Sequence, residues 1–355
     1  MTVYLINVAL ILIFGYILLA NNKSDKNTKI YCGLVAFQWT LISGLRHVSV
    51  GADTYNYSIR FEEAKTISWS KLFENFYNYI FKGEDVNDPG YFIIQKFFQI
   101  FCKDYHVYLI FIALIFTSFM AVWIYKNSKD PCFSFILYSV LFYSFYALTG
   151  HRQTIATALI VFLGYKYIKE RKLVKFALIA FVAFTIHKSS VVFIPYYFIA
   201  NIPITPVYVL VAFIIILIVA LMGKNLYGPL SQALGFSDEQ IDYAVGGAET
   251  YAAVLTLMCV VILLFYYFYK NKTENATRIF NITLLTLMSS LLVFQNQSFM
   301  RVQQYYSLYL CVSFPEVINS FEKKSRVFVY IVTISFLVLY LIRENPQYLF
   351  FWQQV

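Results

Sequence analysis

The chain has 355 residues, of which 60% are hydrophobic, 20% aromatic and only 13% charged. This composition is too apolar for an ordinary soluble domain. The formal net charge of +9 does not indicate nucleic-acid binding, because the basic residues are distributed among short connections instead of forming one basic face. Basic connections of this kind hold the cytoplasmic side of membrane proteins at an anionic leaflet. We therefore expect an all-α, multi-pass membrane protein.

Apolar segments recur along the chain, with roughly the 17–25 residues that a helix needs to cross about 30 Å of hydrocarbon. The first segment has no basic stretch before it, so it is interpreted as a retained span and not as a cleaved signal peptide. About twelve spans are predicted, near residues 3–20, 30–45, 106–125, 133–149, 153–168, 174–187, 189–201, 206–223, 252–269, 278–295, 303–320 and 327–343.

Residues 174–201 allow two interpretations, one long helix or two short spans. A single crossing would place the basic connections at 270–278 and 321–326 on the outer side, against their charge. Two spans are therefore favoured. The whole chain is predicted to form one polytopic domain, with an outer loop at 46–105 and a second outer loop at 224–251. Within the first loop, the aromatic run at 91–98 is suited to lying in the membrane interface.

Lysine and arginine in the short connections predict the orientation. One set of connections carries 16 basic residues and the alternate set carries 5, with the long 46–105 loop left out of the count. With twelve spans, both termini and the 46–105 loop lie outside. The outer set consists of Arg152, Lys188, Lys224, Arg301 and Arg343.

No cofactor and no bound metal are predicted. The five cysteines include no C-x-x-C pair, and the histidines at 47, 151 and 187 have no metal-ligand spacing. The sequence also contains no phosphate-binding loop, no dinucleotide fingerprint and no serine-nucleophile elbow.

Four arginine- or lysine-centred patches fall on the predicted outer face. Residues 46–57 follow a span, residues 151–153 form a very short turn, residues 186–190 join two short spans, and residues 301–305 begin a late span. The candidate residues in these patches are Arg46, Asp53, Tyr57, Arg152, Gln153, His187, Lys188, Arg301, Gln304 and Tyr305, with Asp88 added from the 46–105 loop.

Arginine suits phosphate, because its planar fork makes bidentate, charge-assisted contacts. Several such groups at a membrane surface fit the diphosphate of a lipid carrier, and nearby Tyr, Asn, Gln and Asp side chains fit sugar hydroxyls. Each residue also has a simpler interpretation. An arginine at a helix end often anchors the helix at the interface. Asp53 could pair with Arg46 or cap a turn, and Asp88-Pro89-Gly90-Tyr91 is typical of a turn entering a helix.

The order and spacing of these residues resemble the EpsG family of Wzy-type polysaccharide polymerases over about residues 30–310. Two positions depart mildly from the family pattern, which often has Glu at Asp88 and Asn at His151. The resemblance rests on Arg46, Gly51-x-Asp53, Tyr57, Phe61, Asp88-Pro89-Gly90-Tyr91, Arg152-Gln153, Ala156, Phe184-Thr185-Ile186-His187-Lys188-Ser189, Arg301 and Tyr305-Tyr306.

The resemblance implies a bacterial plasma-membrane glycosyltransferase with a fold similar to GT-C-like Wzy polymerases. It would join repeat units carried on undecaprenyl diphosphate at the outer face, in capsule, exopolysaccharide or O-antigen synthesis. The lipid bilayer, a chain-length regulator and a flippase would be its partners, and nucleic acid would not. Arg152 and Arg301, then Arg46, would hold the diphosphate, and either Asp53 or His187 would accept the acceptor's proton.

Two other functions stay open. A flippase for lipid-linked oligosaccharides would be equally polytopic and basic, but its charges should line a central cavity within the spans. Another membrane transferase, either an O-antigen ligase or a sugar acyltransferase, is also possible. An acyltransferase would need a catalytic histidine facing its acyl donor, and only His187 suits that role.

Overall fold

The computed structural model describes residues 1–20, 23–84, 86, 88–233, 248–268 and 273–354. Helices make up 82% of the structure, and the described residues contain no strand. The expected all-α class is therefore confirmed.

The first half of the described chain consists of α1 (Thr2–Gly15), η1 (Tyr16–Ala20), α2 (Asp25–Gly44), α3 (Thr54–Thr66), α4 (Trp69–Tyr77), η2 (Asn78–Lys82), α5 (Pro89–Phe98), α6 (Tyr105–Asn127), α7 (Pro131–Leu137), η3 (Tyr138–Phe142), η4 (Ser144–Thr149), α8 (His151–Thr157), η5 (Ala158–Leu163) and α9 (Gly164–Lys169). The second half consists of α10 (Leu173–Ile186), η6 (Lys188–Phe193), α11 (Ile194–Ile199), α12 (Pro206–Ala233), α14 (Glu249–Phe268), α15 (Glu274–Val293), η7 (Gln297–Phe299), α16 (Met300–Ser307), α17 (Leu310–Asn319) and α18 (Lys323–Glu344).

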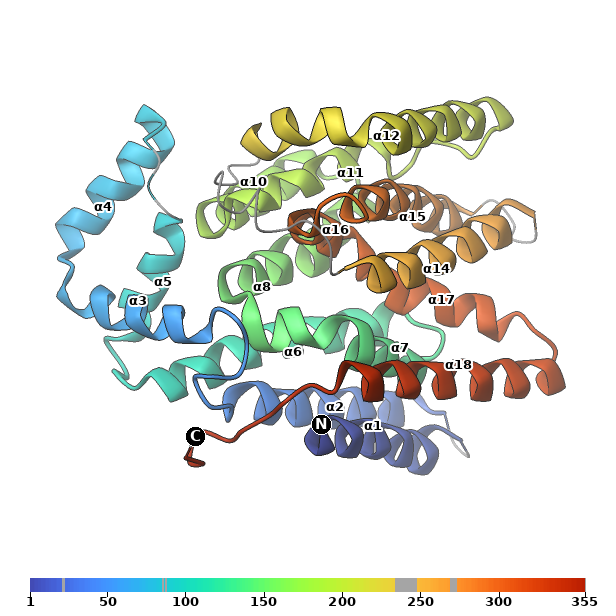
Figure 1. The fold of residues 1–355 in the computed structure, drawn as a ribbon, viewed down its shortest axis with the longest axis horizontal. Helices are drawn as coiled ribbons and strands as arrows, with labels where there is room; N and C mark the ends of the chain where they lie inside the picture. The colour runs from blue at the N-terminus through green and yellow to red at the C-terminus, as the bar shows by residue number, and fades with distance from the viewer. Residues whose placement is uncertain (21–22, 85, 87, 234–247, 269–272, 355) are drawn as a thin grey trace.

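Most of these helices lie roughly alongside one another in a bundle, whereas α3, α4 and α5 gather at one end of it (Figure 1). The packing of α2 against α6 depends on Gly44, because a Cβ atom there would lie 2.6 Å from Cγ1 of Ile110. Aromatic rings fill much of the interior; Trp39, for example, is fully buried and donates its indole N–H to Ser139 Oγ at 3.0 Å.

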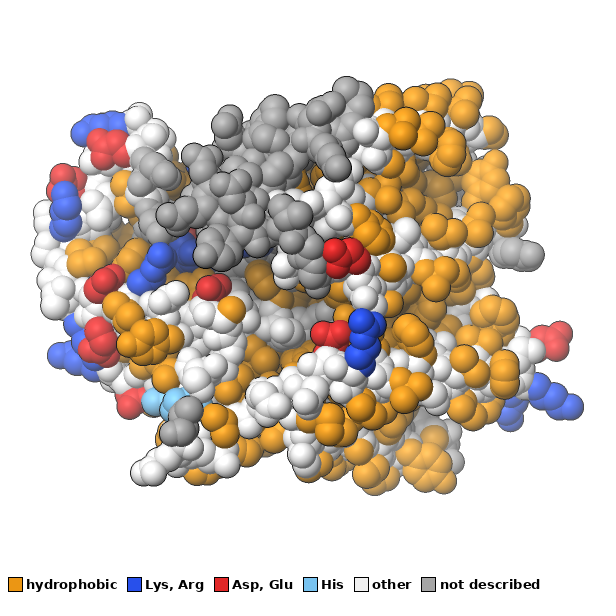
Figure 2. Space-filling model, in the orientation of Figure 1, with side chains coloured by type: hydrophobic (Ala, Val, Ile, Leu, Met, Phe, Trp, Pro, Cys, Tyr) orange, Lys and Arg blue, Asp and Glu red, His pale blue; other side chains and the backbone are white. Residues whose placement is uncertain are grey.

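Among the described residues, five helices are long and apolar enough to cross a membrane, which agrees with an all-α membrane protein. They are residues 2–20, 105–127, 249–268, 274–293 and 323–344. The other predicted spans are found as shorter or interrupted helices, so the total of twelve crossings stays a prediction. Hydrophobic side chains cover much of the surface between the two ends of the bundle on the face that Figure 2 shows.

The interruptions fall at positions where the sequence places polar residues. At His187 the backbone is extended, with φ −156° and ψ 114°, so α10 ends and η6 begins after it. The predicted division of 174–201 into two segments is therefore confirmed as a break in the helix. Residues 144–149 and 158–163, on either side of the 150–157 segment, form wide π-helical turns, a feature that often marks functional sites.

The basic connections approach one another at the end of the bundle opposite α3–α5. Lys23 Nζ donates to the Lys129 carbonyl at 2.6 Å, and Arg171 lies 3.9 Å from Glu274. The alternate connections carry Arg46, Arg152 and the rest of the candidate residues. The division between two ends matches the charge count, while the assignment of these ends to the two sides of a membrane stays a prediction.

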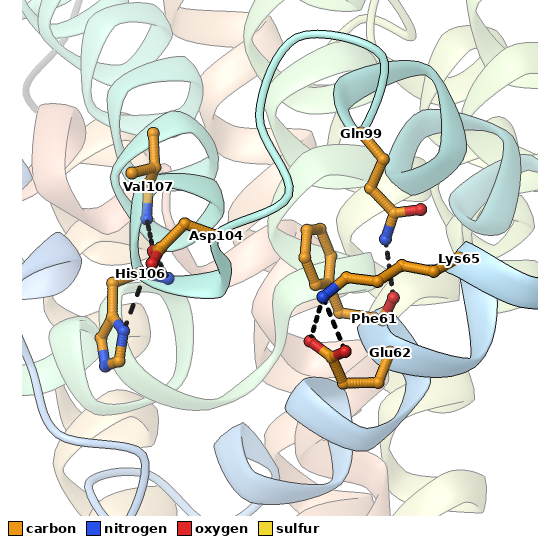
Figure 3. Close-up of polar contacts among 7 residues, drawn as sticks. All are labelled: Phe61, Glu62, Lys65, Gln99, Asp104, His106 and Val107. Atoms are coloured by element: carbon orange, nitrogen blue, oxygen red, sulfur yellow. Dashed lines mark hydrogen bonds and ion pairs between the residues drawn. The ribbon is translucent and has the colours of Figure 1, made fainter.

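The predicted outer loop 46–105 is mostly helical and is tied down by polar contacts. Figure 3 shows Gln99 Nε2 donating to the Phe61 carbonyl at 2.6 Å, and Asp104 Oδ1 accepting the backbone N–H groups of His106 and Val107, which caps α6. The same view shows the surface pair of Lys65 and Glu62 at 2.6 Å. Gln99 thereby joins the end of α5 to α3, whereas the Asp104 and Lys65–Glu62 contacts are local to α6 and α3.

The segment expected in the membrane interface is packed on one face and exposed on the other, so its place at the interface stays a prediction. Tyr91 and Gln95 of α5 are both 0% exposed, because α5 lies against α3, α4 and α10. Phe97, on the other face of the same run, is 58% exposed, and on α4 Trp69, Phe73 and Tyr77 are exposed at helical spacing. The pattern at 91–98 was ambiguous because a helix buried on one side and a helix lying on lipid have the same periodicity.

The structure describes only part of the second predicted outer loop, 224–251. Helix α12 continues beyond the expected end of its span at residue 223 to Ala233. Most of the predicted loop 224–251, residues 234–247, lies outside the described residues.

The carboxyl-terminal tail, residues 345–354, returns to the end of α2. His47 N–H donates to the Leu349 carbonyl at 2.8 Å, and Phe351 N–H donates to the Leu45 carbonyl at 2.9 Å. These bonds hold the backbone on both sides of Arg46, a contact between the two ends of the chain that no local sequence pattern predicts.

Candidate active site

The site is built around Asp88, which precedes α5 at the inner edge of the 46–105 segment. Its backbone is left-handed, with φ 46°, a conformation that costs a non-glycine residue about 1–3 kcal/mol and is retained mainly at functional positions. Gly90 permits the close approach of α5 to α10, since a Cβ atom there would lie 2.7 Å from the Thr185 carbonyl oxygen. The Asp88 carboxylate is thereby brought to the break in the helix at His187.

Three donors converge on this carboxylate. Arg152 Nη1 donates to Oδ2 at 2.6 Å, His187 Nδ1 donates to Oδ2 at 3.0 Å, and the Lys188 backbone N–H donates to Oδ1 at 3.2 Å. Burial of Asp88 raises its pKa, but the hydrogen bond from His187 and the positive charge of Arg152 outweigh this and hold the pKa below its ordinary value. Asp88 is therefore ionised at neutral pH.

His187 is oriented by this contact. Because the carboxylate can only accept, the Nδ1 atom carries the proton and Nε2 keeps a lone pair. Burial lowers the pKa of His187 below 6.5, Asp88 opposes that change, and the charges of Arg152 and Arg301 add to it. The imidazole is thus neutral at pH 7, with its side chain 16% exposed and no hydrogen bond from Nε2 to any described residue. A neutral, oriented imidazole of this kind can act as a general base.

Arg152 is held at three points by its neighbours. Its Nε donates to the Tyr57 hydroxyl at 3.2 Å, its Nη1 meets Asp88, and its Cζ lies 5.7 Å from the Tyr57 ring centroid. The side chain is 19% exposed. Part of the guanidinium fork is consequently used to orient Asp88, and a direct contact between Arg152 and a diphosphate stays a prediction.

A second layer lies beneath this cluster. The His151 ring stacks on Tyr57 with 4.3 Å between centroids and 15° between planes. Arg46 Nη2 donates to His151 Nε2 at 2.6 Å, and Arg46 Nη1 bonds to the Ser43 carbonyl and hydroxyl oxygens. Arg46 is only 1% exposed. In this arrangement it supports Tyr57 from below through His151, and its predicted diphosphate contact has no support from the geometry.

The late arginine patch joins the site through helix contacts. Gln153 Nε2 donates to the Arg301 carbonyl at 2.6 Å, and the Tyr305 hydroxyl lies 3.1 Å from Ser189 Oγ. Gln153 and Tyr305 are both buried, so their observed contacts connect α8 and η6 to α16. The Gln304 carbonyl accepts the Tyr146 hydroxyl at 2.6 Å in the same way.

Two predicted residues stand apart from the carboxylate cluster. The Asp53 carboxylate immediately precedes α3, does not cap it, and makes no hydrogen bond or ion pair with any described residue. The Lys188 ammonium likewise has no partner in the described part of the chain, although its backbone N–H binds Asp88. The structure therefore does not pair Asp53 with Arg46, and a catalytic role for Asp53 stays a prediction.

The sequence pattern around Asp88 favours a turn more than a functional site. Asp88 was included among substrate-binding candidates but interpreted first as a turn residue, because Asp before Pro-Gly is common in turns. The structure shows what the sequence could not, since Tyr91 is completely buried against Tyr57 and Tyr108, with ring centroids 5.7 and 6.4 Å away. Such a buried tyrosine indicates that the turn is packed inward and is not a surface connection.

The arrangement combines a base with cations. Within the described ranges, no group of three or more His, Cys, Asp and Glu side chains is placed to hold a metal ion. The charges of Arg152 and Asp88 offset each other, and Lys188 and Arg301 are further cations nearby. A proton acceptor beside such charge suits the transfer of a group from an anionic leaving group to a hydroxyl.

Comparison with known proteins agrees with this chemistry. The profile of the EpsG family matches residues 29–353. No curated protein and no solved structure shows a significant match. Because the family match spans nearly the whole chain, the protein belongs to the EpsG family, a Wzy-type polymerase-like family with a general role in polysaccharide polymerisation.

Proposed function

We propose that this protein polymerises oligosaccharide repeat units carried on undecaprenyl diphosphate, at the outer face of a bacterial plasma membrane. The acceptor is the non-reducing end of a new lipid-linked unit, and the donor is the growing glycan on its lipid diphosphate. The acceptor hydroxyl oxygen attacks the donor's anomeric carbon. The bond from that carbon to the diphosphate oxygen breaks, and lipid diphosphate leaves with the bonding electrons.

In this proposal His187 Nε2 accepts the hydroxyl proton. The supporting observation is the Asp88–His187 pair, 3.0 Å apart, in a member of a polymerase-like family. Asp88 selects the tautomer that leaves Nε2 free and stabilises the imidazolium that forms when the proton arrives. Of the two bases left open by the sequence, the geometry favours His187 over Asp53.

The remaining residues orient the base and stabilise charge. Arg152 holds the Asp88 carboxylate from the side opposite Lys188, and Tyr57 holds Arg152. Lys188 and Arg301 offset the charge of the departing diphosphate. Since lipid diphosphate is already a good leaving group, most of the rate gain is expected from orienting the two substrates and from this fixed positive charge.

The glycans of a deletion strain test the function. A polymerase defect should remove long chains while single repeat units still reach the cell surface. A flippase defect should instead leave lipid-linked units inside the cell, and that result would refute the proposal.

The proposed base is tested by returning His187→Gln to the deletion strain at wild-type protein level. Glutamine can still donate to Asp88 but cannot accept the proton at neutral pH, so long chains should stay absent. His106→Gln is the matched control, because His106 lies near the surface at the start of α6 and contacts Asp104, not Asp88. Normal chain length with His187→Gln would exclude His187 as the base.

A further inference from the structure

A cavity of about 770 Å³ lies beside the carboxylate cluster. It is enclosed by η3 and η4, the start of α14, the start of α16 and the end of α18. Ligand sites in proteins typically measure roughly 300–1,000 Å³, so the cavity has room for a short oligosaccharide. The proposed function above did not use it.

The lining of the cavity combines aromatic rings with hydrogen-bonding side chains. Phe145, Tyr251 and Tyr340 contribute rings, and Gln297, Gln304 and Arg343 contribute polar groups. Sugars require both kinds of surface, because their C–H faces pack on rings and their hydroxyls need donors and acceptors. A cavity between α2 and α6 is more apolar along its length, where Phe37, Leu114 and Val122 line it, and Lys29 and Lys126 also contribute to its wall.

Gln304, one of the lining residues, has a side-chain oxygen without a hydrogen-bond partner among the described residues. The residue is only 2% exposed, and this oxygen, Oε1, is buried. A buried amide oxygen left without a partner costs about 1–3 kcal/mol. Rotation of the Gln304 side chain toward the adjoining cavity would let a bound hydroxyl group pair with this atom.

Arg301 connects the cavity to the proposed base. It lines the cavity, and its charge also contributes to lowering the pKa of His187. Thr149, on the opposite wall, is followed after Gly150 and His151 by Arg152 of the carboxylate cluster. A ligand in the cavity would therefore lie with one end at Arg301 and near His187.

We propose that this cavity binds the glycan of the donor, with its diphosphate end at Arg301. The inference rests on the proposed polymerase function and deepens it by assigning the donor to one site. Only in the donor does the reacting carbon belong to a sugar ring and carry a diphosphate directly, so only the donor requires a sugar-binding cavity and a cation at the same point. The acceptor hydroxyl, a whole repeat unit away from its own diphosphate, would approach from the His187 side.

The test is calorimetric titration of the purified full-length protein with two probes. One is the free repeat-unit oligosaccharide released by mild acid from the lipid-linked units of the deletion strain. The other is the same oligosaccharide with its diphosphate retained at the reducing end. We expect saturable binding of both probes and tighter binding of the diphosphate form.

Three variants and two matched controls distinguish the parts of the proposal. Ser144→Trp narrows the cavity from an exposed position on its wall and should weaken both probes at least tenfold, whereas Gln347→Trp, on an exposed tail position outside the cavity, should not. Tyr340→Leu should weaken both probes and Tyr340→Phe should not, because only the first removes the ring. Arg301→Gln should abolish the advantage of the diphosphate form.

The outcomes separate this inference from the proposed function. Absence of binding to the wild-type protein, or binding unchanged by Ser144→Trp, would refute a sugar site in the cavity even if the deletion strain behaves as a polymerase mutant. Equal affinity for the two probes would refute the donor assignment. Conversely, a flippase phenotype in the deletion strain would refute the polymerase proposal, whatever the titrations show.

Discussion

Replacing Asp88 by asparagine tests the centre of the proposed site with almost no change in shape. Asparagine keeps an oxygen that can accept the Lys188 N–H, but its amide group would confront the donors on Arg152 and His187, now 2.6 and 3.0 Å away. The substitution therefore removes the charge that holds Arg152 and the acceptor that fixes the His187 tautomer.

The magnitudes follow from these contacts. Breaking a buried ion pair costs roughly 3–5 kcal/mol, and since the Arg152 side chain is 19% exposed, water can solvate part of it and the loss should fall at or below the lower end of that range. A positioned general base contributes about 10²- to 10⁴-fold to a rate. We therefore expect polymerisation to fall by roughly that factor, about 2.7–5.4 kcal/mol of barrier, while the protein still folds.

The assay compares chain-length distribution in the complemented deletion strain and turnover by the purified protein, each normalised to folded protein. Glu63→Gln is the matched control, since Glu63 is an exposed carboxylate of α3 whose side chain has no partner among the described residues. Turnover by Asp88→Asn within threefold of wild type would refute the role assigned to Asp88, because neither the tautomer nor the placement of Arg152 could then depend on its charge.

The other predictions concern neighbouring features. Arg152→Lys should lose most polymer, because one ammonium cannot contact both Asp88 and Tyr57; normal chain length at equal protein level would contradict this. Burial lowers the pKa of His187, so activity should persist as pH falls to 6.5, the ordinary histidine value, and decline only below it; a pH–rate profile that already declines above 6.5 would contradict a neutral base. Gly51→Ala should lower the midpoint of thermal unfolding, through a loss of roughly 1–3 kcal/mol, because φ is +93° and a Cβ atom would lie 2.1 Å from the Leu148 carbonyl oxygen; an unchanged midpoint would contradict that strain. Cysteine at exposed Ala52 should react with an impermeant reagent added to intact cells and cysteine at exposed Lys172 should not, and the reverse pattern would invert the proposed orientation.

Several aspects of the helices could be predicted from local sequence. Long apolar segments near residues 3–20, 106–125 and 327–343 coincide with helices of membrane-spanning length, because each such segment must satisfy its own backbone hydrogen bonds. The break at His187 was also predictable, since a polar Ile-His-Lys-Ser-Ser segment between two apolar runs favours the end of one helix and the start of another. Charge in the connections correctly separated the two ends of the bundle.

The interfacial helix was less predictable. The aromatic run at 91–98 has the periodicity of a helix with one apolar face, but periodicity alone does not tell whether that face meets lipid or protein. In the structure Tyr91 and Gln95 are buried by α3 and α10, while Phe97 on the opposite face of the run stays exposed. The difference arises from contacts between helices that are distant in the sequence.

The sequence by itself determined the helical membrane class, the candidate residues and the family resemblance, because these depend on local composition and on the order of residues along the chain. The tertiary structure decided which candidates meet. It placed Asp88 between Arg152 and His187, turned Arg46 inward toward His151, and left Asp53 apart, through contacts spanning 64 to 105 positions in the chain. Such contacts result from the packing of whole helices, so the same Asp-Pro-Gly turn could lie on a surface or, as here, form the centre of a site.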